Sequence, residues 1–292
     1  MKAAASRELW RYREPRRHEI ISDLVRAHST NRQDIREAVL RGRDLSQTRE
    51  VLELGCGFGF MSSAVAPRVH PSARITGVDA CRDNREPFSA RVRAAGRRAA
   101  FVWMTVEAGL PWRDRIYDLC VASHSLYYFP QIIPEVARML SPDGRFFALT
   151  HGIESAQALS RAAGLPPERS PVVRVVSRFC SENAVELLRR SFAVVEAVEY
   201  RNSLVFAPDE VEELLLYLRF KFRALTEWPE SEPELRRLES ANWLRAVFAD
   251  GPVTIDKTDT GFWCAGPLCR PAPPDQETWQ EGDGTGDRLW PI

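Results

Sequence analysis

Two acids and three closely spaced glycines are the residues of this chain whose types and spacing predict chemistry. Residues 51–60 read VLELGCGFGF, in which an apolar run contains Glu53 and leads into Gly55, Gly57 and Gly59. Glycines at a strand exit let the backbone turn sharply and approach a ligand, because no Cβ stands in the way. Asp79 ends the next apolar run, where an acid accepts hydrogen bonds from ribose hydroxyls. The pattern favours a nucleotide-type cofactor site over the alternative, a glycine-rich turn with Asp79 capping a helix.

The glycine spacing then narrows the choice of cofactor. The dinucleotide fingerprint is GxGxxG, and this chain carries Phe60 where the third glycine would stand. The segment instead resembles motif I, E/DxGxGxG, of the class I S-adenosylmethionine-dependent methyltransferases. In that family the loop holds the methionine end of the cofactor and the second-strand acid binds the ribose. The resemblance implies S-adenosyl-L-methionine as the cofactor, bound by Glu53, Gly55, Cys56, Gly57, Gly59, Asp79 and Ala80.

The next two apolar runs continue the family's order. Residues 99–106, AAFVWMTV, predict the third strand, and the following EAGLPW resembles the segment that borders the adenine. Thr105 stands where the family usually has the aspartate that contacts the adenine amino group, so Glu107 or backbone groups would have to supply that contact. The cofactor-binding candidates of this segment are Thr105, Val106 and Glu107. Residues 117–129 predict the fourth strand and its exit loop, in which Ser123 is a further cofactor-binding candidate.

These elements predict an α/β fold, namely a doubly wound, seven-stranded Rossmann-like methyltransferase sheet. Strands that alternate with helical patterns form right-handed parallel crossovers, and their ligands lie at the carboxyl ends of the strands. A helix, turn and fifth strand are expected over 137–152. The sixth and seventh strands are expected at 192–200 and 259–267.

Helical patterns flank and interrupt this sheet. We expect an N-terminal helical cap at 1–45 with helices over 15–28 and 32–41, a methyltransferase domain at 46–269 and a flexible tail at 270–292. A helical insertion at about 205–250 separates strands six and seven. It would form a lid over the acceptor site or a homodimer interface. The apolar face that either role would use consists of Leu214, Leu215, Leu218 and Phe222.

A second resemblance concerns the acceptor. The exit HSLYYF, the segment after the fifth strand and the insertion together resemble the layout of histamine N-methyltransferase-like enzymes over about residues 9–267. That resemblance implies that Tyr127 and Tyr128 line the acceptor pocket, that Tyr12 closes over it and that His124 contacts the substrate. The glutamate that grips histamine has no clear counterpart here, so histamine itself is not predicted.

Histidine chemistry supplies the candidates for a base. His124 is the first because its pKa should lie near neutrality, and a substrate-orienting or wall role is the alternative. His151, at the end of the fifth strand, is the second and another substrate-binding candidate. The catalytic prediction is thus His124 with Tyr127 and Tyr12. The three tyrosines Tyr12, Tyr127 and Tyr128 would form aromatic walls able to hold a cationic amine.

Composition excludes several classes of function. The chain has 40 Lys and Arg against 40 Asp and Glu, so its formal charge is zero and the broad positive field of nucleic-acid binders is missing. Six cysteines without a CxxC pair argue against a metal and for a reducing compartment. No signal-peptide pattern or apolar run of ~18 residues occurs, which predicts a cytoplasmic location and no membrane partner. Only three of the 40 basic residues are lysines, which favours a GC-rich bacterial genome.

Methyl transfer from S-adenosylmethionine to a nitrogen or oxygen of a small metabolite is the function that these patterns favour. The alternative is a cofactor-binding regulatory or partner subunit without catalysis. Aminopropyl transfer is disfavoured, because SHSLYYF lacks the paired acids of polyamine synthases.

Overall fold

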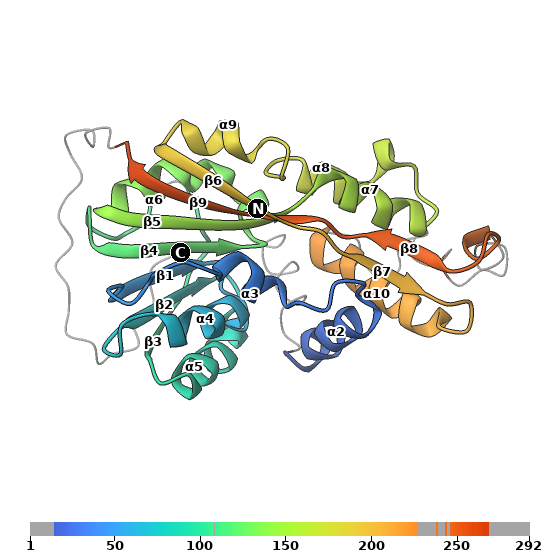
Figure 1. Cartoon of the computed structure of the whole chain (residues 1–292), viewed down its shortest axis with the longest axis horizontal. Helices are drawn as coiled ribbons and strands as arrows, with labels where there is room; N and C mark the ends of the chain where they lie inside the picture. Colours follow the sequence, from blue (N-terminus) through green and yellow to red (C-terminus); the bar gives the residue numbers. More distant parts are fainter. Residues whose placement is uncertain (1–14, 108, 227–237, 239–242, 244–245, 269–292) are drawn as a thin grey trace.

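A seven-stranded sheet forms the centre of the molecule, as the computed structural model shows (Figure 1). The structure describes residues 15–107, 109–226, 238, 243 and 246–268, so the predictions on Tyr12 and the 270–292 tail lie outside it. The strand order is β3-β2-β1-β4-β5-β9-β6, parallel from β3 to β5, with β9 antiparallel to both of its neighbours. This order confirms the predicted fold class. The strands of the sheet are β1 (Glu50–Leu54), β2 (Arg74–Asp79), β3 (Arg98–Trp103), β4 (Tyr117–Ser123), β5 (Leu140–His151), β6 (Phe192–Tyr200) and β9 (Asp259–Pro267).

Helices cover both faces of the sheet (Figure 1). Successive side chains of a strand point to opposite faces, so Val51 and Leu52 enter two different apolar clusters. Val51 packs in the cluster of α3 (Ile35–Leu40), α4 (Phe60–Val65) and α5 (Arg85–Ala94). Leu52 packs in the cluster of α6 (Ile133–Met139) and α9 (Ala184–Arg189). Because both faces are covered, β1 is an almost continuous apolar run.

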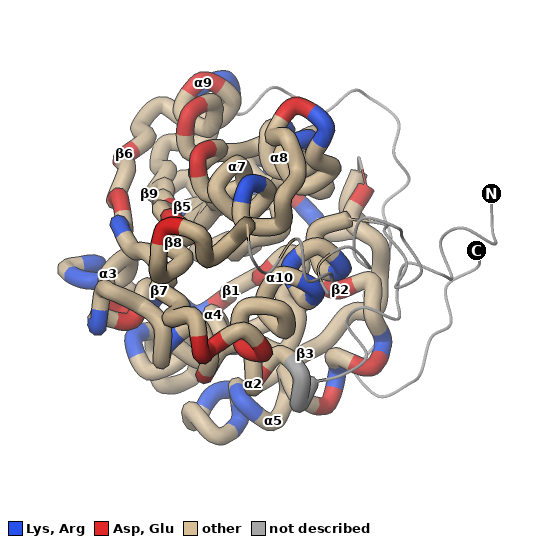
Figure 2. The backbone as a smooth tube through the Cα atoms, turned by 90° about the vertical axis from the view of Figure 1, so that its right-hand side faces the viewer, with Lys and Arg blue, Asp and Glu red and all other residues tan. Residues whose placement is uncertain are grey.

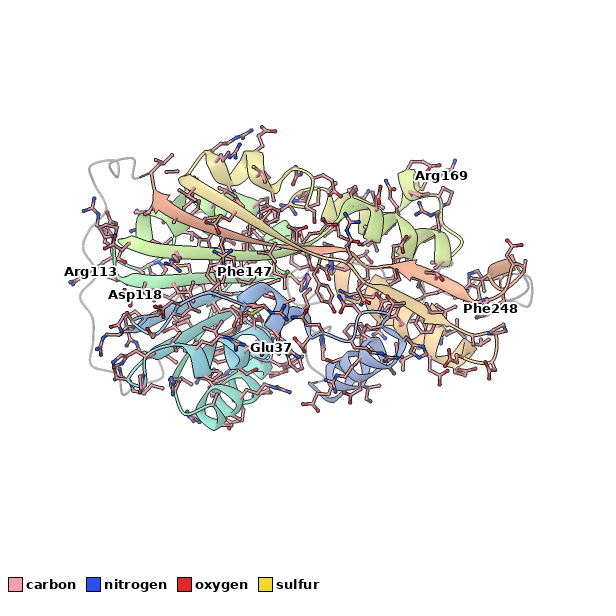
Figure 3. All side chains as sticks on the ribbon, viewed as in Figure 1. Glu37, Arg113, Asp118, Phe147, Arg169 and Phe248 are labelled. Atoms are coloured by element: carbon pink, nitrogen blue, oxygen red, sulfur yellow. The ribbon has the colours of Figure 1, made fainter. Side chains whose placement is uncertain are left out.

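Two side chains on strands of the sheet form hydrogen bonds with neighbouring segments of the chain. At the amino-terminal end of β4, the Asp118 carboxylate accepts hydrogen bonds from the N–H groups of Arg49 (2.8 Å) and Glu50 (3.0 Å) (Figure 3). On β9, the Trp263 indole N–H donates to the Val39 carbonyl at 2.9 Å. Helix α3 therefore packs against the sheet.

A second, two-stranded sheet continues the β6–β9 pair beyond the central sheet (Figure 1). Strands β6 and β9 end their pairing at Tyr200–Asp259. The same two segments pair again from Ser203–Asp256 onward, as β7 (Ser203–Phe206) and β8 (Val253–Asp256). The sequence analysis did not predict these two strands. The pair lies beyond the carboxyl ends of β4 and β5 together with α2 (Pro15–His28), α7 (Ile153–Ala162), α8 (Pro171–Val176) and α10 (Val211–Leu225).

The apolar face of α10 is buried inside the chain. Leu214, Leu218 and Phe222 are fully buried and Leu215 is 7% exposed, because α10 packs against α2, α8 and β7. These four side chains therefore offer no exposed surface for the homodimer that the sequence suggested as one role of the insertion.

Charged positions are interspersed over the surface helices and loops, with basic and acidic residues alternating on the same elements (Figure 2). Within the described ranges, no helix combines the length and the apolar character needed to span a bilayer.

Candidate functional site

The glycine loop that follows β1 is hydrogen-bonded to the carboxyl end of β2. The N–H groups of Gly55 and Cys56 both donate to the Val78 carbonyl, at 2.8 and 3.0 Å. Gly55 and Gly57 have φ angles of 68° and 49°, which lie in a region that residues with a Cβ rarely adopt. A Cβ on Gly55 would lie 2.5 Å from the Ser125 side chain, whereas one on Gly57 would meet nothing within 4 Å. Gly55 thus lets the β4 exit approach, and Gly57 faces open space.

Gly59 has a structural role instead. Its φ of 78° starts α4, and an added Cβ would lie 3.0 Å from the Phe88 ring. The packing of α4 on α5 requires glycine there.

Two buried carboxyl groups hold this loop. Asp79 accepts hydrogen bonds from the N–H groups of Gly57 and Cys81, each at 2.8 Å, and from the Asn84 amide at 3.0 Å. Glu53 accepts from the backbone N–H of Ser62 at 3.1 Å and from its hydroxyl. Burial raises the pKa of Asp79 and raises that of Glu53 to about 8. Asp79 therefore anchors the loop and Glu53 anchors the first turn of α4 behind it, and both acids also border the space beside the loop.

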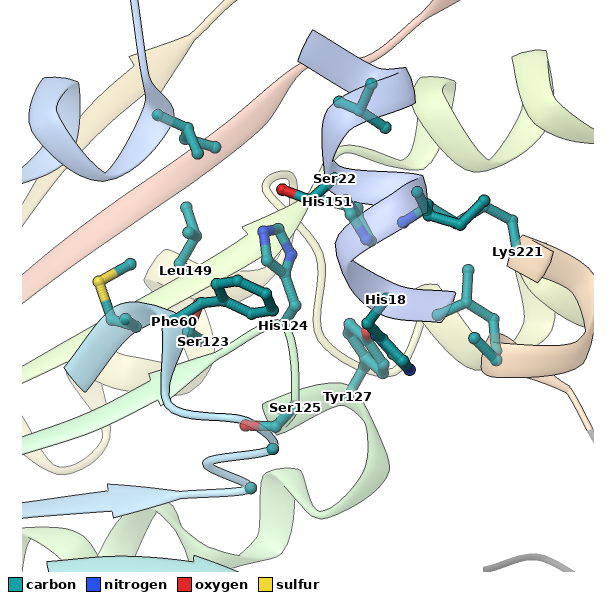
Figure 4. A pocket seen from close by; sticks show the side chains of 18 of the residues that line it. His18, Ser22, Phe60, Ser123, His124, Ser125, Tyr127, Leu149, His151 and Lys221 are labelled. Atoms are coloured by element: carbon teal, nitrogen blue, oxygen red, sulfur yellow. The ribbon is translucent and has the colours of Figure 1, made fainter. Parts of the chain in front are cut away.

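That space is a cavity of about 1030 Å³ that runs from the glycine loop to the second sheet (Figure 4). Cavities that hold one drug-sized ligand measure about 300–1000 Å³, so this one has room for a cofactor and a small second ligand. The loops after β1 to β5 line one side of it. On the other side lie α2, through residues that include His18 and Ile21, and α10, through Phe220 and Lys221.

Two stacked histidines form the floor of the cavity between these sides. The rings of His124 and His151 have centroids 4.3 Å apart and planes inclined by 27° (Figure 4). His124 has a positive φ of 52°, its N–H donates to the Leu149 carbonyl at 2.8 Å, and its Nδ1 is buried without a hydrogen-bond partner. Burial lowers the pKa of both rings. The Asp259 carboxylate opposes this effect and the nearby lysines add to it, so that the pKa of each ring stays below its usual value. Both imidazoles are therefore neutral near pH 7.

An aspartate from the last strand distinguishes the two rings. His151 Nδ1 lies 2.5 Å from Asp259 Oδ1, and the other oxygen of this carboxylate pairs with the Lys257 ammonium. Burial alone would raise the pKa of Asp259, but the Lys257 ammonium and the hydrogen bond with His151 hold it below its usual range. The Nδ1 of His151 therefore carries the proton, and its Nε2 is the basic nitrogen. The ligand-type atoms of His124, His151 and Asp259 lie within 4.8 Å of one another, but the Lys257 ammonium opposes a metal ion there.

Most of the predicted site residues meet at this cavity. Gly59 does not line it, and neither does the exposed Glu107; Tyr12 lies outside the described residues. The third strand ends at Trp103 rather than at residue 106, so Thr105 and Val106 border the cavity from a loop. The predicted residues that line it are Glu53, Gly55, Cys56, Gly57, Asp79, Ala80, Thr105, Val106, Ser123, His124, Tyr127, Tyr128 and His151.

Sequence reasoning missed several functional candidates. Lys221 and Lys257 line the cavity, and Asp259 is the partner of His151. The scarcity of lysine was an available signal, since the chain has only three and two of them face one cavity. His18 and Phe58, which stack edge-on at 4.7 Å, gave no sequence signal, because nothing links residue 18 to the loop after β1.

The strand order, the glycine loop at the end of β1 and the acid at the end of β2 are those of the fold that class I S-adenosylmethionine-dependent methyltransferases share. Comparison with known proteins agrees, since residues 51–144 match the family described as "Methyltransferase domain". S-adenosylmethionine is the cofactor of this class of domain.

Two curated bacterial proteins each match about a third of the chain. The uncharacterised methyltransferase YcgJ of Bacillus subtilis (strain 168) is 31% identical over 105 residues, which are 35% of this chain and 40% of that protein. A ubiquinone biosynthesis O-methyltransferase of Idiomarina loihiensis is 27% identical over 105 residues, covering 35% of this chain and 42% of the relative. The chain thus spans about two fifths of the length of the curated relatives it matches.

A solved structure extends the comparison to most of the fold. The crystal structure of a putative methyltransferase from Bacillus halodurans C-125 superposes with a TM-score of 0.53 over 80% of this chain and 99% of that one. The sequence identity is 12%, so the likeness concerns the fold alone.

Proposed function

We propose that this chain transfers a methyl group from S-adenosylmethionine to a nitrogen or oxygen of a small molecule. The observation that carries the proposal is the single cavity, because the same space that borders Gly57 and Asp79 also borders the His124–His151 pair and α10. A methyltransferase needs this continuity, since the acceptor atom must reach the methyl carbon to within about 3 to 3.5 Å.

The residues of the glycine loop fit the cofactor. A Cβ on Gly57 would enter open space, which is what a loop that meets a ligand through its main chain requires. Asp79, at the end of β2, would accept hydrogen bonds from the ribose, and Thr105 and Val106 would border the adenine. When bound, S-adenosylmethionine supplies a methyl carbon activated by the sulfonium charge. The chain then has to exclude water and orient the acceptor.

We assign the base role to His151, in place of His124. The neutral Nε2 of His151 would accept the proton that the acceptor N–H or O–H loses as its lone pair bonds to the methyl carbon and the S–CH3 bond breaks. The Asp259 carboxylate, 2.5 Å from Nδ1, would stabilise the imidazolium that forms. His124 has no carboxylate partner and stacks on the His151 ring, so it would position that ring.

The helices around the acceptor end of the cavity would exclude water from it. Helix α10 lines the cavity with Phe220 and Leu225, and the Tyr128 hydroxyl donates to the Ala224 carbonyl at 2.7 Å. These contacts support the proposal that the insertion is a lid and that α2 belongs to a cap. The likeness to the histamine N-methyltransferase-like layout rests on the sequence pattern alone. The match to an O-methyltransferase covers 35% of this chain and leaves the choice between nitrogen and oxygen open.

The test is a product search with a labelled cofactor. The purified chain is incubated with S-adenosylmethionine carrying a deuterated methyl group and a bacterial metabolite extract, and species that acquire the label are sought by mass spectrometry. We expect one labelled product and an equal amount of S-adenosylhomocysteine. The matched control is Gly57→Val, whose side chain would fill the cofactor's space. Cofactor binding without any labelled product above that control would refute methyl transfer and favour a binding subunit.

A further inference from the structure

Lys221 is a cation at the acceptor end of the cavity, near the Asp259 carboxylate but in an ion pair with none of the acids that the structure describes. It extends from α10 toward His151 (Figure 4). Among the described residues, no carboxylate lies within ion-pair distance of its ammonium. The nearby Lys257 is different, because Asp259 neutralises it. Burial lowers the pKa of Lys221 to about 8, and the charge of Lys257 adds to the effect, yet the group stays largely protonated at neutral pH.

The acids that line the cavity lie apart from the cations at its acceptor end. The acids that line it within the described residues are Glu53 and Asp79 at the glycine loop and Asp34, which pairs with Arg36. All three lie away from α10. At the acceptor end, α8 and its C-terminal turn add the cations Arg174 and Arg178, and no carboxylate of the described ranges joins the lining there. A charged group in low-dielectric surroundings is costly unless a ligand or side chain neutralises it.

We propose that the methyl acceptor is an organic acid whose carboxylate pairs with the Lys221 ammonium. This inference rests on the proposed methyl transfer and identifies the class of its substrate. Arg174 and Arg178 are exposed, so water can solvate their charges, whereas Lys221 is only partly exposed. Its one ammonium matches one negative charge, which favours a carboxylate over a phosphate dianion. The same positive charge opposes the cationic amine that the aromatic residues alone suggested.

The aromatic side chains that line the cavity indicate the shape of the apolar part of this acid. Phe60 and Tyr127 border the space on the side of the central sheet, and Phe220 borders it from α10. A planar, apolar body such as an aromatic ring would pack between these rings while the carboxylate reaches Lys221. The nitrogen or oxygen to be methylated would then face His151, beside the same lysine.

The test compares four probes that share a phenyl ring: benzoate, the neutral benzamide, benzylammonium and phenyl phosphate. Their binding to the chain saturated with S-adenosylhomocysteine is measured by calorimetry. We expect benzoate to bind at least about tenfold more tightly than benzamide, the least that a charge-assisted hydrogen bond provides. Lys221→Met should reduce this preference to less than about twofold, and Lys221→Arg should retain most of it. The charge-matched control is Arg190→Met, which removes an exposed cation on the α9 side and should leave the preference intact.

Each other outcome overturns the proposal. Equal or tighter binding of benzamide or benzylammonium would exclude an anionic acceptor, as would a benzoate preference that survives in Lys221→Met. Tighter binding of phenyl phosphate that is lost in Lys221→Met would replace the carboxylate by a phosphate. Absence of benzoate binding at millimolar concentration, in a chain that binds S-adenosylhomocysteine, would also refute the inference. Failure to bind S-adenosylhomocysteine at all would refute the proposed function instead.

Discussion

Replacing Asp79 by alanine should weaken both the cofactor complex and the fold, by amounts that can be separated. The carboxylate accepts three hydrogen bonds, and the N–H groups of Gly57 and Cys81 would lose their acceptor. Unmet buried donors cost about 1 to 3 kcal/mol each, but removing a carboxylate that is itself costly to bury offsets part of this. We therefore expect a loss of about 2 to 4 kcal/mol in the free energy of unfolding without cofactor, measured in urea.

The affinity for S-adenosylhomocysteine should fall by a further, separate amount. Losing a charged acceptor for the ribose hydroxyls costs about 1.5 to 3 kcal/mol, or about 10- to 150-fold in Kd by calorimetry. Asp118→Ala is the matched control, because Asp118 also accepts two backbone N–H groups but lies at the opposite edge of the sheet. It should lower stability and leave the affinity unchanged. Wild-type affinity in a folded Asp79→Ala protein, or equal weakening in Asp118→Ala, would refute a ribose contact.

Three further predictions concern the rest of the cavity. Gly57→Val should abolish the thermal shift caused by S-adenosylhomocysteine while the protein stays folded, and a normal shift would show that this loop does not hold the cofactor. His151→Asn should lower kcat by about 100-fold or more, with the remaining rate rising with pH, while His124→Asn should affect kcat less; the reverse order would return the base role to His124. Burial raises the pKa of Glu53 from 4.5 to about 8, so the stability that its protonation contributes is complete below pH 4.5 and is lost as the pH rises through about 8. Glu53→Gln should flatten this part of the urea-unfolding profile between about pH 5 and 9, and an unchanged slope would contradict the buried, protonated acid.

The sequence was sufficient to place the loop of the proposed cofactor site because its signals are local. The turn after β1 needs left-handed φ angles and a close approach to Ser125, so glycines had to stand at fixed spacing. Parallel strands bring their carboxyl ends to one edge of the sheet. The order of the apolar runs was therefore enough to place the glycine loop beside Asp79. The bounds of β6 and β9 were likewise predicted as observed, since each is an apolar run between turn residues.

Tertiary structure decided the acceptor half, because its contacts join residues far apart in the chain. His151 and Asp259 are 108 positions apart and meet only because β5 and β9 pair in antiparallel register. Lys221 reaches the same place because the β7–β8 extension carries α10 past the end of the sheet. No local pattern encodes that register, so the sequence named His124 as the base. The fold identified the histidine that has a carboxylate partner.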